Sequence, residues 1–509
     1  MAQVTVQSGG YVSVPGSGTD VVALQTQIAT ALNSAAGTAG VNFYTASLTG
    51  GGPVPAPPGS ATVTEAYITG GTGNNSYNIG SAYQYVVVNQ TGAANDTVTL
   101  AAGQDVISGT IGSVFVGAGN DTVALGGGNN VYQSSGVNGF LLSDYVVGGS
   151  GNDTLSEANG GTLDGGGGTN LLVADSTAGN VTFISSGARD TIGAGAAINV
   201  VTLTAAAFGA DVFGGAATTS LTVSDFGTGD TIAGISAGSV AATLAGSGGM
   251  LYGGTANTLS VLANGVGDTV SGQSAASMTV TIAGGADVVA AGSGAATVLA
   301  SGNAAGQIIG GSGSLLFLGG AGTSTVRAGT GTNSIVGGSG GLVVAAVSGT
   351  TSVTSGTGVV TLFGGAGSDV TFRSNAAGLL YVAGSGNETL DASGSSGNDS
   401  LYGGAASGAN LLMKAGSGND TFIGGAGNNT LVGGSGHDLF AFFSVNGGGQ
   451  DSLGTLTSSD TIALIGYSLT DAANMASVSS SASSGSSVSY KLSDGTQISF
   501  LAGSGVHII

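Results

Sequence analysis

The sequence has 509 residues, of which 102 are glycine, and 5 basic against 26 acidic side chains give a formal net charge of −21. This acidity argues against nucleic acid as a partner, the absence of cysteine excludes disulfides, and no apolar run approaches the roughly 18 residues that a membrane-spanning helix needs. A hydrophobic share of 41% and only 6% charged residues are not typical of a disordered protein.

Residues 1–62 are predicted to form a small N-terminal module with one short helix. Apolar residues recur at i, i+4 and i+8 from Leu24 over Val21–Ala35, and Gly37 follows the last turn. This helix is the only one that the pattern predicts. Its apolar stripe fits packing within the module, which we favour, or docking to a cell envelope or another subunit.

A linker is expected to end this module. All five prolines lie in the first 58 residues, and Gly50–Ser60 has the composition of a semi-rigid linker. A continuous parallel sheet uses nearly every backbone N–H, so proline is excluded from it. The first residues, MAQVTVQSGGYVSV, lack the basic and apolar regions of a cleaved secretory signal, so an export signal is expected elsewhere.

Residues 63–190 are predicted to be an irregular part of a repeat domain. Glycine-rich turns followed by short apolar strands recur there, as in GAGNDTVAL around Asp121 and GGSGNDTLS around Asp153. Their spacing is uneven, and the insertion Gln133–Val147 is expected to form loops or an extra strand.

Residues 191–345 are predicted to be a regular part with a period of 19 residues. Triplets of an aspartate, any residue and an apolar residue begin at Asp211, Asp230, Asp268 and Asp287, and positions 249 and 306 continue the same phase. A fixed period of this length is typical of a solenoid. Gly310–Ala345 keeps the glycine-rich turns but has lost the carboxylates, so we expect metal-poor coils there.

Residues 346–441 contain the most complete repeats, and AGSGNDTFI, GGAGNNTLV and GGSGHDLFA follow one another over Ala415–Ala441. Their glycines allow positive φ and close backbone approach, so each repeat is expected to open with a sharp turn. The last three residues then form a short strand whose middle residue, such as Phe422, Leu431 or Phe440, faces the core.

Two such repeats are expected to complete one coil, so residues 18 apart stack on the same edge. Asp420 is therefore predicted to lie directly under Asp438, while Asn429 lies on the opposite edge. Further turns of this type precede them at Asp369, Glu388 and Asp399.

Residues 442–509 depart from the repeat and are predicted to form a β cap. Alternating residues in Val488–Leu492 and Gln497–Leu501 flank Asp494-Gly495, which is typical of a hairpin. A solenoid end exposes a sheet edge and an open core, so a cap is structurally required.

The nonapeptide G-G-x-G-x-D-x-U-x, with U apolar, resembles the calcium-binding repeat of RTX (repeats-in-toxin) proteins. The resemblance is specific over Gly364–Ala441 and at the turns of Asp121 and Asp153, and it is looser over Asp190–Gln307. It implies an all-β fold, a right-handed parallel β-solenoid or β-roll with coils of 18–19 residues, with calcium between stacked turns and folding after secretion. The tail resembles the C-terminal region of type I secretion substrates, which implies a cap that also carries the export signal; a cap alone is the alternative.

The acidic residues of the turns are the predicted calcium ligands, because a cluster of roughly six to eight carboxylate and carbonyl oxygens suits calcium. A merely soluble acidic surface is the alternative interpretation of the net charge. The predicted metal ligands are Asp121, Asp153, Asp211, Asp230, Asp268, Asp287, Asp369, Glu388, Asp399, Asp420 and Asp438.

The sequence offers little for catalysis, and we predict that the protein is not an enzyme. His437 and His507 have no evident partner, and no HExxH zinc helix or GxSxG elbow in a strand-turn-helix context is found. Five scattered basic residues are few for the lyases and epimerases that act on acidic sugars.

These patterns predict a protein that is secreted, extracellular or at the cell surface, has a structural role, and assembles with copies of itself on binding calcium. A surface layer or an extracellular filament fits best, with type I secretion machinery as the export partner and residues 1–62 as a cell-surface anchor. An adhesin or ligand-binding rod is the alternative, followed by a polysaccharide-acting β-helix enzyme.

Overall fold

The computed structural model describes residues 2–5, 11–14, 19–38, 41–49, 53–68, 75–80, 82–88, 97–100, 105–108, 113–116, 120–126, 129–134, 144–158, 160–175, 179–234, 236, 238–366, 369–374, 378–404, 409–446 and 448–509. The chain divides into two compact units, Met1–Val261 and Leu262–Ile509. Parts of the predicted linker, Gly50–Gly52, and of its first glycine-rich turn, Gly70–Asn74, lie outside the described residues.

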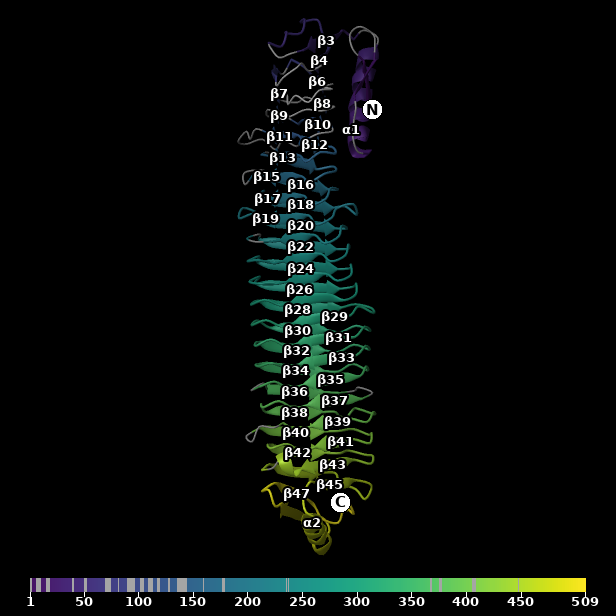
Figure 1. Ribbon diagram of the computed structural model, residues 1–509, viewed down its shortest axis with the longest axis vertical. Coiled ribbons are helices and arrows are strands. Elements are labelled where there is room, and N and C mark those ends of the chain that lie inside the picture. The colour runs from purple at the N-terminus through teal and green to yellow at the C-terminus, as the bar shows by residue number, and fades with distance from the viewer. Residues whose placement is uncertain are drawn as a thin grey trace. The chain divides into compact units, whose positions relative to one another are not determined.

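Each unit is a parallel β-solenoid, as the sequence predicts. The chain alternates between two sheets, and a strand pairs in parallel with the strand one coil later, so that β12 pairs with β14 in the first unit and β36 with β38 in the second. We call the two sheets even and odd, after the numbers of most of their strands (Figure 1).

In the first unit, the even-sheet strands are β3 (Phe43–Leu48), β4 (Val63–Ile68), β6 (Tyr85–Val88), β8 (Asp105–Ser108), β10 (Thr122–Ala124), β12 (Asp144–Val147), β14 (Gly161–Asp164), β16 (Asn180–Ser185), β18 (Ile198–Leu203), β20 (Ser220–Asp225) and β22 (Ser239–Leu244). The odd-sheet strands are β5 (Ser76–Ile79), β7 (Thr97–Leu100), β9 (Ser113–Val116), β11 (Val131–Ser134), β13 (Thr154–Glu157), β15 (Leu171–Ala174), β17 (Thr191–Ala194), β19 (Asp211–Gly214), β21 (Thr231–Ala233) and β23 (Met250–Tyr252). A separate antiparallel pair is formed by β1 (Ala2–Thr5) and β2 (Tyr11–Val14), and β24 (Thr258–Ala263) spans the division between the units.

In the second unit, the even-sheet strands are β26 (Ser277–Ile282), β28 (Ala295–Ala300), β30 (Leu315–Leu318), β32 (Thr332–Val336), β34 (Thr350–Thr354), β36 (Asp369–Arg373), β38 (Glu388–Asp391), β40 (Asn410–Lys414), β42 (Asn428–Val432), β44 (Gln450–Gly454), β46 (Ser487–Lys491) and β47 (Gln497–Leu501). The odd-sheet strands are β25 (Thr269–Ser271), β27 (Asp287–Ala290), β29 (Gly306–Ile309), β31 (Ser324–Arg327), β33 (Leu342–Ala345), β35 (Val360–Phe363), β37 (Leu379–Val382), β39 (Ser400–Tyr402), β41 (Thr421–Ile423), β43 (Leu439–Phe443), β45 (Thr461–Ile465) and β48 (His507–Ile508). A single 3₁₀ turn, η1 (Ser444–Asn446), follows β43.

The core lies between the two sheets of each unit and is filled by the alternate residues of every strand. In the second unit Phe422 and Phe440 are fully buried and stack with ring centroids 4.9 Å apart, and Leu431 faces them from the even sheet. The predicted inward orientation of these three residues is confirmed. Because successive residues of a strand point to opposite faces, the polar residues between them reach the outer surface.

The helix α1 (Thr19–Gly37) contains the predicted segment Val21–Ala35 and lies beside the first coils of its unit (Figure 1). Ile28 and Leu32 are buried against outward-facing residues of the even sheet, among them Val87 and Val147. The apolar stripe of α1 therefore packs on the solenoid itself. No helix in the described part of the chain is long and apolar enough to cross a membrane.

A second helix, α2 (Leu469–Ser481), was not predicted, because its serine-rich sequence has low helix propensity. A capping box starts it: the hydroxyl of Ser468 accepts the N–H of Asp471 at 3.1 Å, and the Asp471 carboxylate accepts from the backbone of Ser468. The buried Met475 anchors the helix to the end of the second unit.

The predicted hairpin near the C-terminus is confirmed, since β46 and β47 pair antiparallel. The strand β47 also pairs with β44, and β48 pairs with β45, so the last strand of each sheet is covered. Pairing these edges satisfies backbone groups that an open solenoid end would leave exposed.

Candidate metal centre

In the first unit, the residue directly before each odd-sheet strand forms a ladder of side-chain oxygens. The backbone N–H of Asn130 donates to Oδ1 of Asp153 at 2.7 Å, and the N–H of Asp153 donates to Oδ1 of Asn170 at 2.9 Å. The N–H of Asn170 in turn donates to Oδ1 of Asp190 at 2.7 Å. We call these four residues the alternating ladder, because amide and carboxylate side chains take turns along it.

In the second unit the same position carries only carboxylates over four successive coils. The N–H of Asp399 donates to Asp420 at 2.7 Å, that of Asp420 to Asp438 at 3.0 Å, and that of Asp438 to Asp460 at 2.9 Å. We call Asp399, Asp420, Asp438 and Asp460 the carboxylate stack. All four are at most 2% exposed. The predicted register of Asp420 with Asp438 is confirmed, and Asn429 lies in the other sheet.

These bonds satisfy backbone N–H groups at the junction of turn and strand, where the sheet ladder has not yet begun. One residue earlier, exposed asparagines do the same in the opposite direction. The N–H of Asn419 donates to Asn398 at 2.8 Å, and the N–H of His437 donates to Asn419 at 3.0 Å. Two side-chain ladders that run in opposite directions therefore hold each coil to the next.

Burial and mutual repulsion act on the carboxylate stack. Burial raises the pKa of Asp399, Asp420 and Asp438 to about 6. Repulsion from Asp399 adds to the effect at Asp420, and repulsion from Asp420 and Asp460 adds to it at Asp438. In the alternating ladder, an amide lies between successive carboxylates, which separates the charges that adjoin in the stack.

The stack holds oxygen atoms that the protein does not satisfy itself. Among the described residues, Oδ2 of Asp399 and Oδ2 of Asp420 are buried without a hydrogen-bond partner. Near Asp438 the chain leaves room, because a Cβ on Gly433 would lie 2.3 Å from its Oδ2. A buried anionic oxygen without a donor is costly unless a cation or proton compensates it.

Backbone carbonyls approach the same turns. A Cβ on Gly434 would lie 2.2 Å from the carbonyl oxygen of Gly416, and one on Gly418 would lie 2.0 Å from that of Gly397. Glycine is required where successive turns stack this closely. Carboxylates together with turn carbonyls are the hard oxygen donors that calcium prefers, so the residues present fit that ion. In the part of the chain that the structure describes, no three carboxylate or imidazole groups gather at one point.

The structure places most predicted metal ligands in buried ladder positions. On the odd sheet these are Asp153 and Asp230 in the first unit, and Asp268, Asp287, Asp399, Asp420 and Asp438 in the second. On the even sheet of the first unit, the N–H of Asp121 donates to Asp144 at 2.9 Å. The site is thus distributed along the coils and is not a single pocket.

Two predicted ligands lie one residue out of phase. Asp211 is the first residue of β19, and Ala210 holds the ladder position, donating its N–H to Asp230 twenty residues later at 2.7 Å. Asp369 is exposed at the start of β36, where Val370 is in register with Glu388. The expected 19-residue spacing from Asp211 to Asp230 is wrong, because that coil has one more residue, and Asp211 turns out of the buried row.

Glu388 occupies a ladder position on the even sheet, but the protein itself satisfies its carboxylate. The hydroxyl of Tyr381 donates to Oε2, and the N–H of Gly384 donates to Oε1 at 3.2 Å and to Oε2 at 3.0 Å. Burial raises the pKa of Glu388. The structure therefore favours a neutral acid in the core at this position over a metal ligand.

Several ladder residues were missed by the sequence analysis. Asp190 and Asp460 each precede a Thr-Ile pair, the same aspartate triplet that located Asp230, so the signal was present. Asp144 and Asp451 lie on the even sheet: Tyr132 donates to Asp144 at 2.6 Å, and Asn429 donates to Asp451 at 2.6 Å. No sequence pattern indicated which turns would bring these partners together.

A family model described as the RTX calcium-binding nonapeptide repeat (4 copies) matches residues 90–116, 113–132, 138–156, 347–372, 382–407 and 412–440. The chain is an RTX-repeat protein. RTX repeats bind calcium, and the matched segments contain three residues of the carboxylate stack, Asp399, Asp420 and Asp438. Searches of curated proteins and of solved structures gave no match.

Proposed function

We propose that this RTX-repeat solenoid is a secreted structural protein that folds on binding calcium and then assembles with copies of itself in a surface layer or extracellular filament. The observation that carries the proposal is the carboxylate stack, in which four buried acids adjoin without an amide between them. Such an arrangement is unfavourable at neutral pH unless a cation accompanies it.

Coupling of calcium to folding follows from the opposing free energies. Ordering glycine costs about 0.5–1 kcal/mol more than ordering alanine in a strand or helix, and this chain has 102 glycines. Calcium bound only by the folded state would stabilise it. Sites with affinities on the order of 10⁻⁴–10⁻³ M, as in extracellular modules, would leave the stack loose in calcium-poor cytosol and ordered outside.

Assembly is supported by charge. Twenty-six acidic against five basic side chains make two copies repel, and divalent cations between them would offset that repulsion. Acidic residues such as Asp175 and Asp369 are exposed on the first and second unit respectively. Residues 442–509 are proposed to carry the type I export signal, and residues 1–62 an anchor that uses groups other than the buried face of α1.

A non-enzymatic role fits the two histidines. Both His437 and His507 are exposed, and the hydrogen bonds found for them come from their backbone N–H groups, to Asn419 and to the carbonyl of Asp460. An imidazole poised for acid–base catalysis would be expected within reach of a partner in a cleft.

Electron microscopy of the purified protein with millimolar calcium, and again with a chelator, tests the proposal. We expect ordered sheets or fibres only with calcium. Dispersed single particles in both conditions would overturn self-assembly and would favour an adhesin or another ligand-binding role. Circular dichroism of the same samples separates a failure to fold from a failure to assemble.

A further inference from the structure

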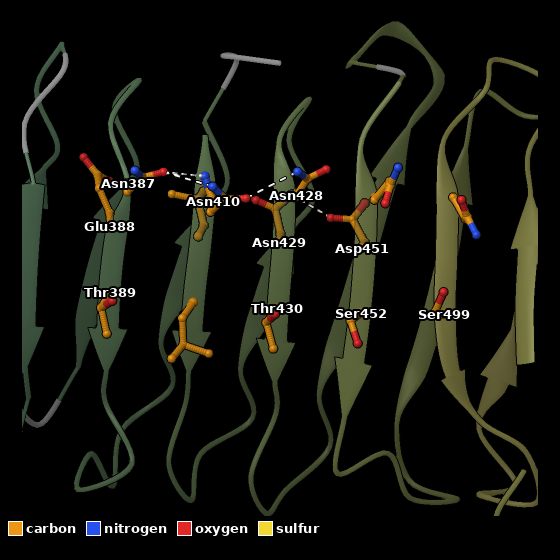
Figure 2. A pocket seen from close by; sticks show the side chains of 14 residues that line it. Asn387, Glu388, Thr389, Asn410, Asn428, Asn429, Thr430, Asp451, Ser452 and Ser499 are labelled. Carbon is orange, nitrogen blue, oxygen red and sulfur yellow. Dashed lines mark hydrogen bonds between the residues drawn. The ribbon is translucent and has the colours of Figure 1, made fainter. Parts of the chain in front are cut away.

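An open groove of about 700 Å³ lies on the even sheet of the second unit, across β38, β40, β42, β44 and β47. Figure 2 shows that its side chains come from neighbouring strands, one coil after another. The groove therefore runs across the strands, and what it presents to a ligand is set by the residues that stack in register from coil to coil.

The first row of the groove consists of amides. Strand register aligns Asn410 with Asn428, and Asn428 with Gln450, and the row continues to Asn387 at one end and Gln497 at the other. The amide of Asn410 donates to Asn387 at 3.2 Å, and the amide of Asn428 donates to Asn410 at 3.3 Å. Each primary amide has two N–H donors, so these bonds fix the orientation of the row and leave further donors at the surface.

The second row consists of hydroxyls, two residues further along each strand. Thr389, Thr430, Ser452 and Ser499 are in register, and Leu412 provides one apolar position between the first two. Thr389, Thr430 and Ser452 are exposed, and no side-chain hydrogen bond is found for their hydroxyls in the described part of the chain. The same row continues upstream on the even sheet through Thr279, Thr297, Leu316, Ser334, Ser352 and Thr371.

Neither row carries an exposed charge, although the chain has a net charge of −21. The next row out contains Asp391 in register with Arg373 and Lys414, and both bases help to lower the pKa of Asp391 after the hydroxyl of Ser393 does. The charges nearest the groove thus offset one another. This face suits a neutral ligand better than an anion or a cation.

The repeat of the rows suits a polymer. Adjacent strands of a sheet are spaced by ~4.8 Å, so amide and hydroxyl groups recur at that interval along the groove. A linear polysaccharide offers hydroxyl donors and acceptors at a regular repeat, together with C–H faces that can pack on Leu412. A second copy of this chain would bring its own acidic surface, and a flat polar face gives it little apolar area to bury.

We propose that this groove binds a neutral linear polysaccharide, which lies across the strands and is hydrogen-bonded by the amide row on one side and the hydroxyl row on the other. The amides serve as donors and acceptors to sugar hydroxyls, and the Thr and Ser hydroxyls do the same. The proposal does not depend on self-assembly, since the groove lies within one unit of a single chain.

Co-sedimentation of the full chain with insoluble cellulose and with chitin, in millimolar calcium, tests this site. Each side-chain hydrogen bond is worth on the order of tenfold in affinity or less, so the double variant Thr430→Val with Ser452→Ala should bind at least roughly tenfold more weakly. Valine keeps the β-branched shape of threonine. The matched control is Thr325→Val with Thr361→Val, which removes hydroxyls from the outer face of the odd sheet and should bind like the parent protein.

Three results would overturn the site. One is retention of neither polysaccharide by protein that is folded by circular dichroism in calcium. Another is retention that the groove variant and the control variant share. The third is a change confined to oligomeric state in analytical ultracentrifugation, which would make the groove a contact between copies. A variant that binds weakly but still forms the assemblies seen by electron microscopy would support the site and leave the structural role intact.

Discussion

The backbone N–H of Asp420 donates to the carboxylate of Asp438 on the next coil at 3.0 Å, and the two acids are held in direct register. The carboxylate of Asp420 meanwhile accepts the N–H of Asp399 at 2.7 Å. Each acid thus satisfies a backbone donor with one oxygen, and the negative charges adjoin. This relationship makes the folded state of the second unit sensitive to anything that neutralises carboxylates.

Asp420→Asn is expected to stabilise the metal-free protein and to weaken its response to calcium. The amide oxygen can still accept the Asp399 N–H, while the like charge between Asp399 and Asp438 is removed. A gain of 1 kcal/mol corresponds to roughly 2–4 °C in midpoint for domains of this size. Thermal melts with chelator and with calcium measure both effects, and an unchanged calcium-induced shift would show that Asp420 is not a ligand.

Asn170→Asp makes the reverse change in the first unit. It places a third carboxylate between Asp153 and Asp190, whose oxygens and N–H groups already bond to Asn170. Without metal we expect local destabilisation, because like charges would then adjoin at a buried position. Hydrogen exchange of β15 and β17 checks this, with Asn419→Asp at an exposed position as the control. Equal protection in parent and variant would mean that amide interleaving has no electrostatic role.

Chelation is expected to act unevenly within the second unit. The coils of the carboxylate stack should lose most of their protection against hydrogen exchange, since four acids there need compensation. The segment Gly310–Ala345 should keep more, because its ladder positions hold Leu315, Ser324, Asn333 and Leu342, which are buried without carboxylates. Equal loss in both segments after addition of chelator would contradict this prediction.

Glu65 should make the attachment of α1 depend on pH. It lies on β4 between Val63 and Tyr67, on the face that α1 covers, and the hydroxyl of Thr45 donates to it at 2.7 Å. Burial raises the pKa of Glu65 from 4.5 to about 7. The folded state therefore favours the protonated form, so this contribution is fully present below about pH 4.5 and is lost as the pH rises through about 7.

Glu65→Gln should remove that dependence. We expect hydrogen exchange of α1 in the parent protein to be faster at pH 8 than at pH 6 after correction for the intrinsic rate, and to be independent of pH in the variant. A parent protein whose corrected exchange does not change over this interval would show that the acid is not titrating under the helix.

Phe422→Ala should destabilise the second unit by about 3–5 kcal/mol, since the side chain is fully buried against Phe440 and leaves a cavity. The control is Phe363→Ala, because Phe363 is 42% exposed and should cost much less. Denaturant unfolding in millimolar calcium compares the two variants. Similar midpoints for both would mean that the stacked rings do not hold the coils together.

The sequence by itself determined the coil. A nine-residue unit contains its own turn glycines, its strand and its core residue, so the parallel solenoid, the inward orientation of Phe422, the register of Asp420 with Asp438 and the C-terminal hairpin all follow from local chemistry. The N-terminal helix follows in the same way from apolar residues at helical spacing. These features need no knowledge of which other coils lie above or below.

Only the tertiary structure decided which polar residues share a row. One extra residue in a coil turns Asp211 outward and brings Asp190 and Asp230 into the buried positions on either side of Ala210, because side-chain direction in a strand alternates with every residue. The phenol of Tyr381 claims Glu388, and asparagines separate the carboxylates of the first unit but not those of the second. Coil lengths add up along the chain and partners come from neighbouring coils, so no single repeat could encode these outcomes.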